Sequence, residues 1–122
     1  MRADLEASLD ALGSAGVQPK WFRPPFGQAT GSTLLEARRH GLRPVLWSAW
    51  GREWAEPDAG AVARRVRAGL GEGAIVLLHD TDAFSPAGSC QRAFEALGPV
   101  ADELDRRGLE AVTLDELADL AA

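Results

Sequence analysis

The chain has 122 residues, 46% hydrophobic and 25% charged, with a formal net charge of −5. This composition is typical of a globular protein that forms a single domain over residues 1–122, and no Lys or Arg cluster with interleaved aromatics indicates nucleic-acid binding. The longest apolar run, Ala74 to Leu78, is too short to span a bilayer and no export signal opens the chain, so we expect a cytoplasmic protein with no membrane partner.

The first residues predict a helix followed by a short strand. Leu5, Leu9 and Leu12 recur at helical spacing within residues 3–13, and glycines follow them. A short apolar segment then ends near Arg23, because the two prolines after it cannot continue a strand.

A second helix and strand follow. Thr33 and Glu36 form a capping-box pattern and Gly41 supplies a stop, which predicts a helix over residues 34–40. The segment from Pro44 to Ser48 is then predicted to be a strand.

The third helix and strand carry the clearest patterns. Asp58 or Pro57 begins a helix that ends at Gly71. The run Ala74 to Leu78 is apolar on both faces, which is typical of a strand covered on each side or closed into a barrel.

The last part of the chain predicts a long helix, a short strand and a terminal helix. The long helix ends at Gly108, and Pro99 should kink or break it. Its apolar residues at helical spacing are Phe94, Leu97, Val100, Ala101 and Leu104. Residues 111–113 are predicted to form a strand, and Thr113 with Glu116 repeats the capping box.

Strands separated by single helices predict parallel pairing, in an α/β sheet or a partial (β/α) barrel of about four strands. Ligands of such folds bind at the carboxyl ends of the strands. The polar residues that follow the predicted strands are Arg23, residues 48–54, His79, Asp80 and Asp82. We therefore expect a site at this rim.

Four segments resemble motifs of the polysaccharide deacetylase family, also called the NodB homology domain. They are residues 23–27 (Arg-Pro-Pro-Phe-Gly), 47–54, 77–80 (Leu-Leu-His-Asp) and 112–117. The resemblance covers the C-terminal half of that domain only. It implies a distorted (β/α) barrel that removes acetyl groups from amino sugars with a divalent, zinc-like metal.

The resemblance also implies roles for individual residues. His79 would be the acid that protonates the departing amine, Glu53 stands where the family has an aspartate that tunes this histidine, and Arg23 would orient a catalytic aspartate. Trp54 would wall the pocket and Leu77 would line the acetyl-binding part of it.

Three further residues are predicted to contact substrate: Phe26, Trp50 and Asp80. Trp50 stands where the family often has an aspartate, so the pocket should be bulkier and less polar than usual. Trp21 and Trp47 are better explained as core aromatics on strands. Arg23 could instead pair with an acidic helix end, and Asp80 and Asp82 could simply turn the backbone.

The family's metal residues have no counterpart in this sequence. The family uses adjacent aspartates and two histidines four residues apart, whereas this chain has no Asp-Asp pair and only His40 and His79. We therefore assign no metal ligand and expect this chain alone to bind no metal. A single cysteine, Cys90, can form neither an intrachain disulfide nor a thiolate metal site.

The sequence thus predicts a hydrolase of the amide (carbon-nitrogen, non-peptide) bond in N-acetylated sugars, incomplete or inactive as this chain alone. The alternatives are a non-catalytic carbohydrate-binding relic, a half-barrel assembly module, or an unrelated α/β domain. The open edges of a half barrel would favour self-association, or pairing with a missing N-terminal half.

Overall fold

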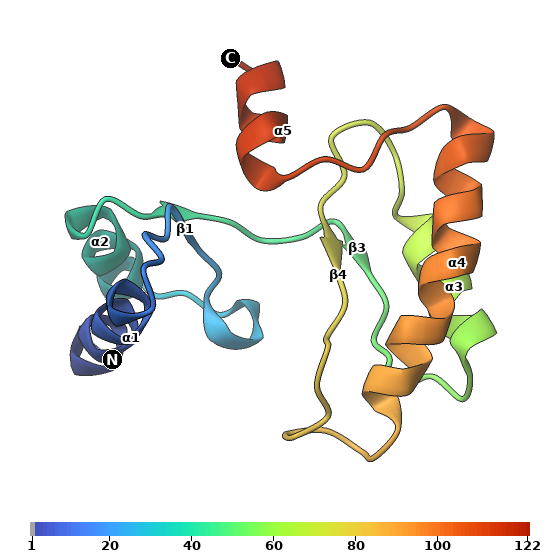
Figure 1. Ribbon diagram of the computed structural model, residues 1–122, viewed down its shortest axis with the longest axis horizontal. Coiled ribbons are helices and arrows are strands. Elements are labelled where there is room, and N and C mark those ends of the chain that lie inside the picture. Colours follow the sequence, from blue (N-terminus) through green and yellow to red (C-terminus); the bar gives the residue numbers. More distant parts are fainter. Residues whose placement is uncertain (1) are drawn as a thin grey trace. The chain divides into compact units, whose positions relative to one another are not determined.

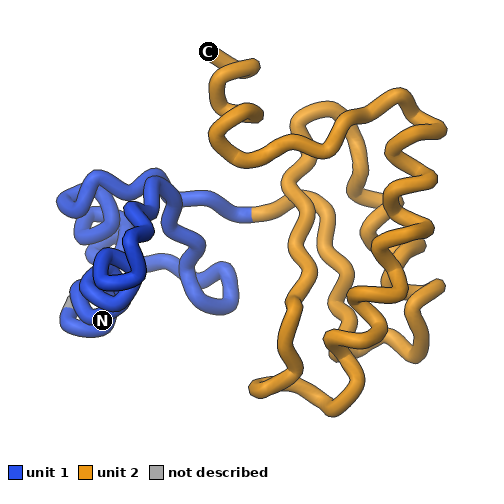
Figure 2. The backbone as a smooth tube through the Cα atoms, viewed as in Figure 1, with its two compact units in different colours: residues 1–46 blue, residues 47–122 orange. Residues whose placement is uncertain are grey.

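The structure, a computed structural model, describes residues 2–122, and of Arg2 only the backbone. It contains two compact units, residues 1–46 and 47–122 (Figure 2). The expectation of a single domain stays a prediction.

The first unit combines helices with one pair of short strands (Figure 1). Its elements are α1 (Arg2–Ser14), β1 (Trp21–Phe22), the 3-10 helix η1 (Pro25–Gly27), α2 (Gly31–Arg39) and β2 (Arg43–Pro44). The strands β1 and β2 pair in parallel, with Trp21 opposite Arg43. The guanidinium of Arg43 lies 4.3 Å from the centre of the Trp21 ring, which holds the register by a cation-π contact.

The start of α2 differs from the prediction. Thr30 caps the helix, because its hydroxyl accepts a hydrogen bond from the Thr33 N–H at 3.2 Å. Thr33 is buried one turn inside, so the capping box assigned to Thr33 and Glu36 was wrong. The predicted stop is confirmed, since Gly41 adopts φ 72° and the N–H of Leu42 bonds back to the carbonyl of Ala37.

The second unit contains β3 (Ala49–Trp50), α3 (Ala59–Ala68), β4 (Val76–Leu77), α4 (Ser89–Arg107) and α5 (Leu114–Leu120). The strands β3 and β4 pair in parallel, with Trp50 opposite Leu77, and α3 and α4 lie on the same side of this pair (Figure 1). The single strand predicted over residues 44–48 was wrong. Pro44 ends β2 in one unit, and pairing resumes only at Ala49 in the other.

The core of the second unit forms where α3 packs on α4 and β3. Asp58, one of the two predicted starts, caps α3, its carboxylate accepting the Ala61 N–H at 2.8 Å. Buried side chains of α3 and α4 then meet. They are Val62, Ala63, Val66, Ala96 and Val100, with Ala49 and Leu70 beside them. This packing fixes the end of β3, after which the polar loop begins.

Helix α4 corrects two expectations. It runs through Pro99 without a break, and Pro99 lies on the exposed side of the helix. The predicted buried face of α4 was partly wrong, because Phe94 and Leu97 are exposed while the smaller Ala93 and Ala96 are buried. Small residues are needed there because α3 packs closely against α4.

Two predicted strands are shorter than expected or missing. The run over residues 74–78 is a strand only at Val76–Leu77, and Val76 stays 37% exposed, so one face is not covered as predicted. Residues 111–113 form no strand. The capping box of Thr113 and Glu116 is confirmed and begins α5.

The predicted fold class is confirmed: short parallel strands alternate with helices, as in part of a (β/α) barrel. The strands form two separate parallel pairs rather than one four-stranded sheet. None of the described helices is long and apolar enough to cross a membrane.

Candidate active site

A tight turn after β3 directs a carboxylate inward. Arg52 adopts φ 50°, an uncommon left-handed conformation for a residue with a side chain, and its carbonyl accepts the Ala55 N–H at 2.8 Å. Gly51 just before it is closely surrounded by side chains, since a Cβ there would meet Leu78 Cδ2 and lie 3.1 Å from Glu53 Oε2. The turn therefore brings Glu53 back against the core.

Glu53 lies directly behind the imidazole of His79. Its side chain is only 1% exposed, and its Oε1 accepts the backbone N–H of His79 at 2.9 Å. The same oxygen contacts Nδ1 of the His79 ring. The second oxygen, Oε2, is buried and has no hydrogen-bond partner among the described residues.

The contact with Glu53 leaves the second ring nitrogen of His79 available for chemistry. With Nδ1 held by Glu53, the remaining ring nitrogen is Nε2, and the His79 side chain is 46% exposed. A buried carboxylate on Nδ1 fixes the tautomer of a histidine. The pair can therefore give or take a proton through Nε2. The sequence-predicted partnership of Glu53 with His79 is present as a direct contact.

Three tryptophan rings and the His79 ring form a series of neighbouring contacts. The ring centres of Trp47 and Trp50 are 5.5 Å apart, those of Trp50 and Trp54 are 5.4 Å apart, and Trp54 lies 5.4 Å from the His79 ring in an edge-on arrangement. Trp47 is half-buried and precedes β3, so its placement on a core strand was wrong. The guanidinium of Arg52 sits 5.3 Å from the Trp50 ring centre.

One residue of this site was not predicted from the sequence. Arg92 on α4 donates from Nε to the backbone carbonyl of Glu53 at 3.0 Å, across 39 positions of sequence. No motif contains it, and it contacts a backbone atom rather than a side chain.

The loop between β4 and α4 holds the other predicted acidic residues. Leu77 is buried on β4, and Asp80 is exposed. The carboxylate of Asp82 accepts the Gly88 N–H at 2.7 Å just before α4 begins, so the interpretation of Asp82 as a turn residue is confirmed.

Arg23 and Phe26 lie in the first unit. Arg23 follows β1 and is exposed. Phe26, inside η1, has φ 56° and is 94% exposed. Such exposure and backbone strain suit a residue that binds rather than packs. Whether these two residues join His79 in one site stays a prediction.

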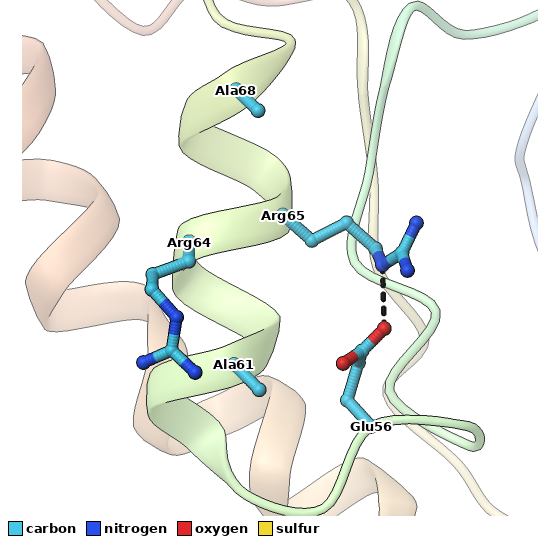
Figure 3. Close-up of a pocket in the computed structure, with 5 residues that line it drawn as sticks. All are labelled: Glu56, Ala61, Arg64, Arg65 and Ala68. Atoms are coloured by element: carbon cyan, nitrogen blue, oxygen red, sulfur yellow. Dashed lines mark hydrogen bonds and ion pairs between the residues drawn. The ribbon is translucent and has the colours of Figure 1, made fainter.

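A separate hollow lies along α3 (Figure 3). Its lining residues are Glu56, Ala61, Arg64, Arg65 and Ala68. Arg65 pairs with Glu56 across it at 2.6 Å. Neither Glu53 nor His79 is among the residues that line this hollow.

Within residues 2–122, one group of side chains could hold a metal ion: Glu6, Glu36 and His40, whose ligand atoms lie within 4.8 Å of one another. It lies in the first unit, where Arg39 already pairs with Glu36 at 3.1 Å. Glu53 and His79 form no such group with a third described residue. The second unit therefore does not fit the metal that the family resemblance implies.

Comparison with known proteins gives no match to a family profile, but clear similarity to individual relatives. The chain is 35% identical over 105 residues to a chitooligosaccharide deacetylase of Bradyrhizobium, covering 81% of this chain and 48% of the relative. It is 34% identical over 113 residues to the peptidoglycan-N-acetylglucosamine deacetylase PgdA of Listeria monocytogenes, covering 93% of this chain and 22% of that protein. The chain thus spans half or less of these relatives.

Solved structures show the same fold. A family 4 carbohydrate esterase from Streptomyces lividans, in complex with acetate, matches with a TM-score of 0.78 and 24% identity over 93% of this chain and 55% of its own. A family 4 pseudoenzyme from Bacillus anthracis matches with a TM-score of 0.82 and 24% identity over 95% and 38%. Together these findings confirm the resemblance to polysaccharide deacetylases of carbohydrate esterase family 4.

Proposed function

We propose that this chain, which is similar to polysaccharide deacetylases over half or less of their length, supplies the proton-donating side of an N-acetyl-sugar deacetylase site. The observation that carries this proposal is the buried Glu53 carboxylate on Nδ1 of His79, with the ring itself half-exposed. Relatives that are named as deacetylases of chitooligosaccharide and peptidoglycan support the substrate class.

The proposed step is the collapse of a tetrahedral intermediate formed on the amide carbon. When the C–N bond breaks, its electron pair goes to nitrogen, which must be protonated to leave as an amine. The protonated imidazole of His79 gives this proton from Nε2 and retains the one on Nδ1. Glu53 holds the ring through Nδ1 and leaves Nε2 as the nitrogen that can act on the substrate.

The indoles supply the means to bind a sugar. Trp54 stands at the edge of the His79 ring, and Trp50 stands next to Trp54. Indole faces combine a large apolar area with low conformational freedom, which suits the apolar face of a sugar ring. Leu77, buried on the strand before His79, is the proposed contact of the acetyl methyl group.

Hydrolysis also needs an activated water, which the family resemblance assigns to a divalent metal. Because Glu53 and His79 form no metal-binding group with a third described residue, the role proposed for this site is limited to substrate binding and proton donation. We expect the 122-residue chain to release no acetate by itself.

The same observation favours a second candidate, a non-catalytic module that binds N-acetylated sugars. The two functions share the Trp50, Trp54 and His79 surface and differ only in whether a water-activating group ever joins it. Supplying the metal ligands from a longer version of the protein would separate the two, since only the first candidate gains activity.

A binding titration tests the shared part of the proposal. We expect an N-acetylated chito-oligosaccharide to change the tryptophan fluorescence saturably, and Trp54→Ala to weaken the binding at least tenfold. Phe94→Ala, which removes an aromatic side chain 69% exposed on α4, is the matched control and should bind normally. Absence of any saturable change contradicts the proposal, and acetate release by the 122-residue chain contradicts the limit placed on it.

A further inference from the structure

The turn that carries Glu53 is held in an unfavourable conformation. Arg52, the residue directly before Glu53, has φ 50°. A left-handed backbone is unfavourable at a residue with a Cβ, and it persists only where surrounding contacts fix it. The contacts that fix this turn must therefore be found around residues 51–55.

Local contacts account for only part of this. The Arg52 carbonyl accepts the Ala55 N–H, which closes the turn, and the Arg52 guanidinium lies over Trp50. The first of these contacts lies within the turn and would survive a rotation of the turn as a whole. It does not fix where the Glu53 carboxylate points.

Arg92 adds a long-range contact from α4 to the one that the Glu53 carboxylate makes with the His79 N–H on the other side of the turn. Its Nε–H donates to the Glu53 carbonyl at 3.0 Å from α4. The start of α4, which carries Arg92, is itself held in place. Asp82 accepts the Gly88 N–H at 2.7 Å, and the Arg92 N–H bonds to the Gly88 carbonyl at 3.2 Å. Arg92 thus ties the Glu53 turn to the packed helix α4.

We infer that Arg92 is a positioning residue, whose Nε–H holds the Glu53 carbonyl and thereby keeps the Glu53 carboxylate on Nδ1 of His79. This inference rests on the proposed function, because the tautomer of His79 matters for chemistry only if Nε2 acts on a substrate. The contact itself is measured without substrate, so failure of sugar binding and failure of this inference are separate results.

Two substitutions isolate the donor. In Arg92→Gln the side-chain amide nitrogen stands as many bonds from Cα as Nε does, so a donor remains while the charge is lost. In Arg92→Met a methyl group takes that place, so charge and donor are both lost at similar length. Arg64→Met is the control, because Arg64 is an exposed arginine of α3 at the hollow of Figure 3.

The readout is the ¹⁵N spectrum of the two His79 ring nitrogens in mildly alkaline buffer, where the tautomer of a neutral imidazole is resolved. We expect a predominant Nδ1–H tautomer in the natural chain, in Arg92→Gln and in Arg64→Met, and a mixed population in Arg92→Met. A folded Arg92→Met with an unchanged tautomer overturns the inference. If Arg92→Met does not fold, Arg92→Leu, which also lacks the donor, takes its place: a mixed population supports the inference, and an unchanged tautomer overturns it.

Discussion

Glu53 touches His79 twice, once through the backbone N–H and once through Nδ1 of the ring, with a single carboxylate oxygen. The backbone contact fixes the distance between β4 and the turn after β3, and the ring contact fixes the tautomer. The Glu53 side chain, which is 1% exposed, thus sets which nitrogen of the half-exposed His79 ring carries the proton.

Replacing Glu53 by leucine should release that tautomer. One carboxylate oxygen accepts both the backbone N–H and the ring N–H of His79, and leucine offers no acceptor in its place, so nothing holds a proton on Nδ1. We expect the Nδ1–H form to lose its predominance in the ¹⁵N spectrum of folded Glu53→Leu. Glu56→Gln, which loses only the exposed pair with Arg65, should leave the spectrum unchanged; a predominant Nδ1–H form in Glu53→Leu would show that the carboxylate does not set the tautomer.

Gly69 should tolerate no side chain, because the end of α3 lies against β3 there. A Cβ at Gly69 would meet Ala49 Cα and the Ser48 carbonyl oxygen, both at 2.8 Å, and backbone atoms cannot move aside cheaply. We expect Gly69→Ala to lower the free energy of unfolding by about 1–3 kcal/mol in urea titrations. Gly71→Ala, two residues further on with open space around it, should change it by less than about 0.5 kcal/mol. Equal effects would show that the close approach to β3 is not needed.

Glu103 should make the second unit sensitive to acid. Hydrogen bonds from Arg106 first and Arg107 second, with the nearby Arg67 charge, lower the pKa of this carboxyl from 4.5 to about 2. A folded pKa below the unfolded one means that the carboxylate stabilises the fold fully above pH 4.5 and that this contribution is lost as the pH falls toward about 2.

The measurement is urea unfolding at steps across that interval. Glu103→Gln should remove much of the decline in stability with falling pH. Glu95→Gln, on the exposed side of the same helix, should retain it. A decline of the same size in Glu103→Gln would mean that other carboxyls cause it.

The capping box at Thr113 should decide whether α5 persists. Thr113 Oγ1 accepts the Glu116 N–H at 3.3 Å, and the Glu116 carboxylate accepts the Thr113 N–H at 2.7 Å. Loss of such a cap costs about 0.5–2 kcal/mol, which a seven-residue helix cannot absorb. We expect hydrogen exchange in α5 to accelerate at least twofold in Thr113→Ala and little in Thr113→Ser; equal rates in the two variants would count against the cap.

Much of the site could be predicted from sequence because its groups follow strands. His79 follows the apolar run ending at Leu78, and Glu53 follows β3, so parallel pairing alone brings the two to the same edge. The run over residues 44–48 misled the strand assignment because apolar periodicity cannot show where the chain passes from one sheet pair to the next. Trp47 was misplaced for the same reason.

Tertiary contacts account for what sequence could not predict. Arg92 acts on a backbone carbonyl, and any residue at position 53 would offer that acceptor, so no pattern marks the pair. On α4 the helical period was right, but the buried face follows the small residues Ala93 and Ala96 rather than Phe94 and Leu97, because close packing against α3 outweighs side-chain hydrophobicity.

The most direct test of the central claim follows both ring nitrogens of His79 during titration with an N-acetylated chito-oligosaccharide. We expect a saturable change at Nε2, with Nδ1 keeping its proton and its chemical shift, because Nε2 faces the sugar and Nδ1 faces Glu53. A change confined to Nδ1, or no change at His79 while the indoles respond, would contradict the assignment of His79 as the proton donor.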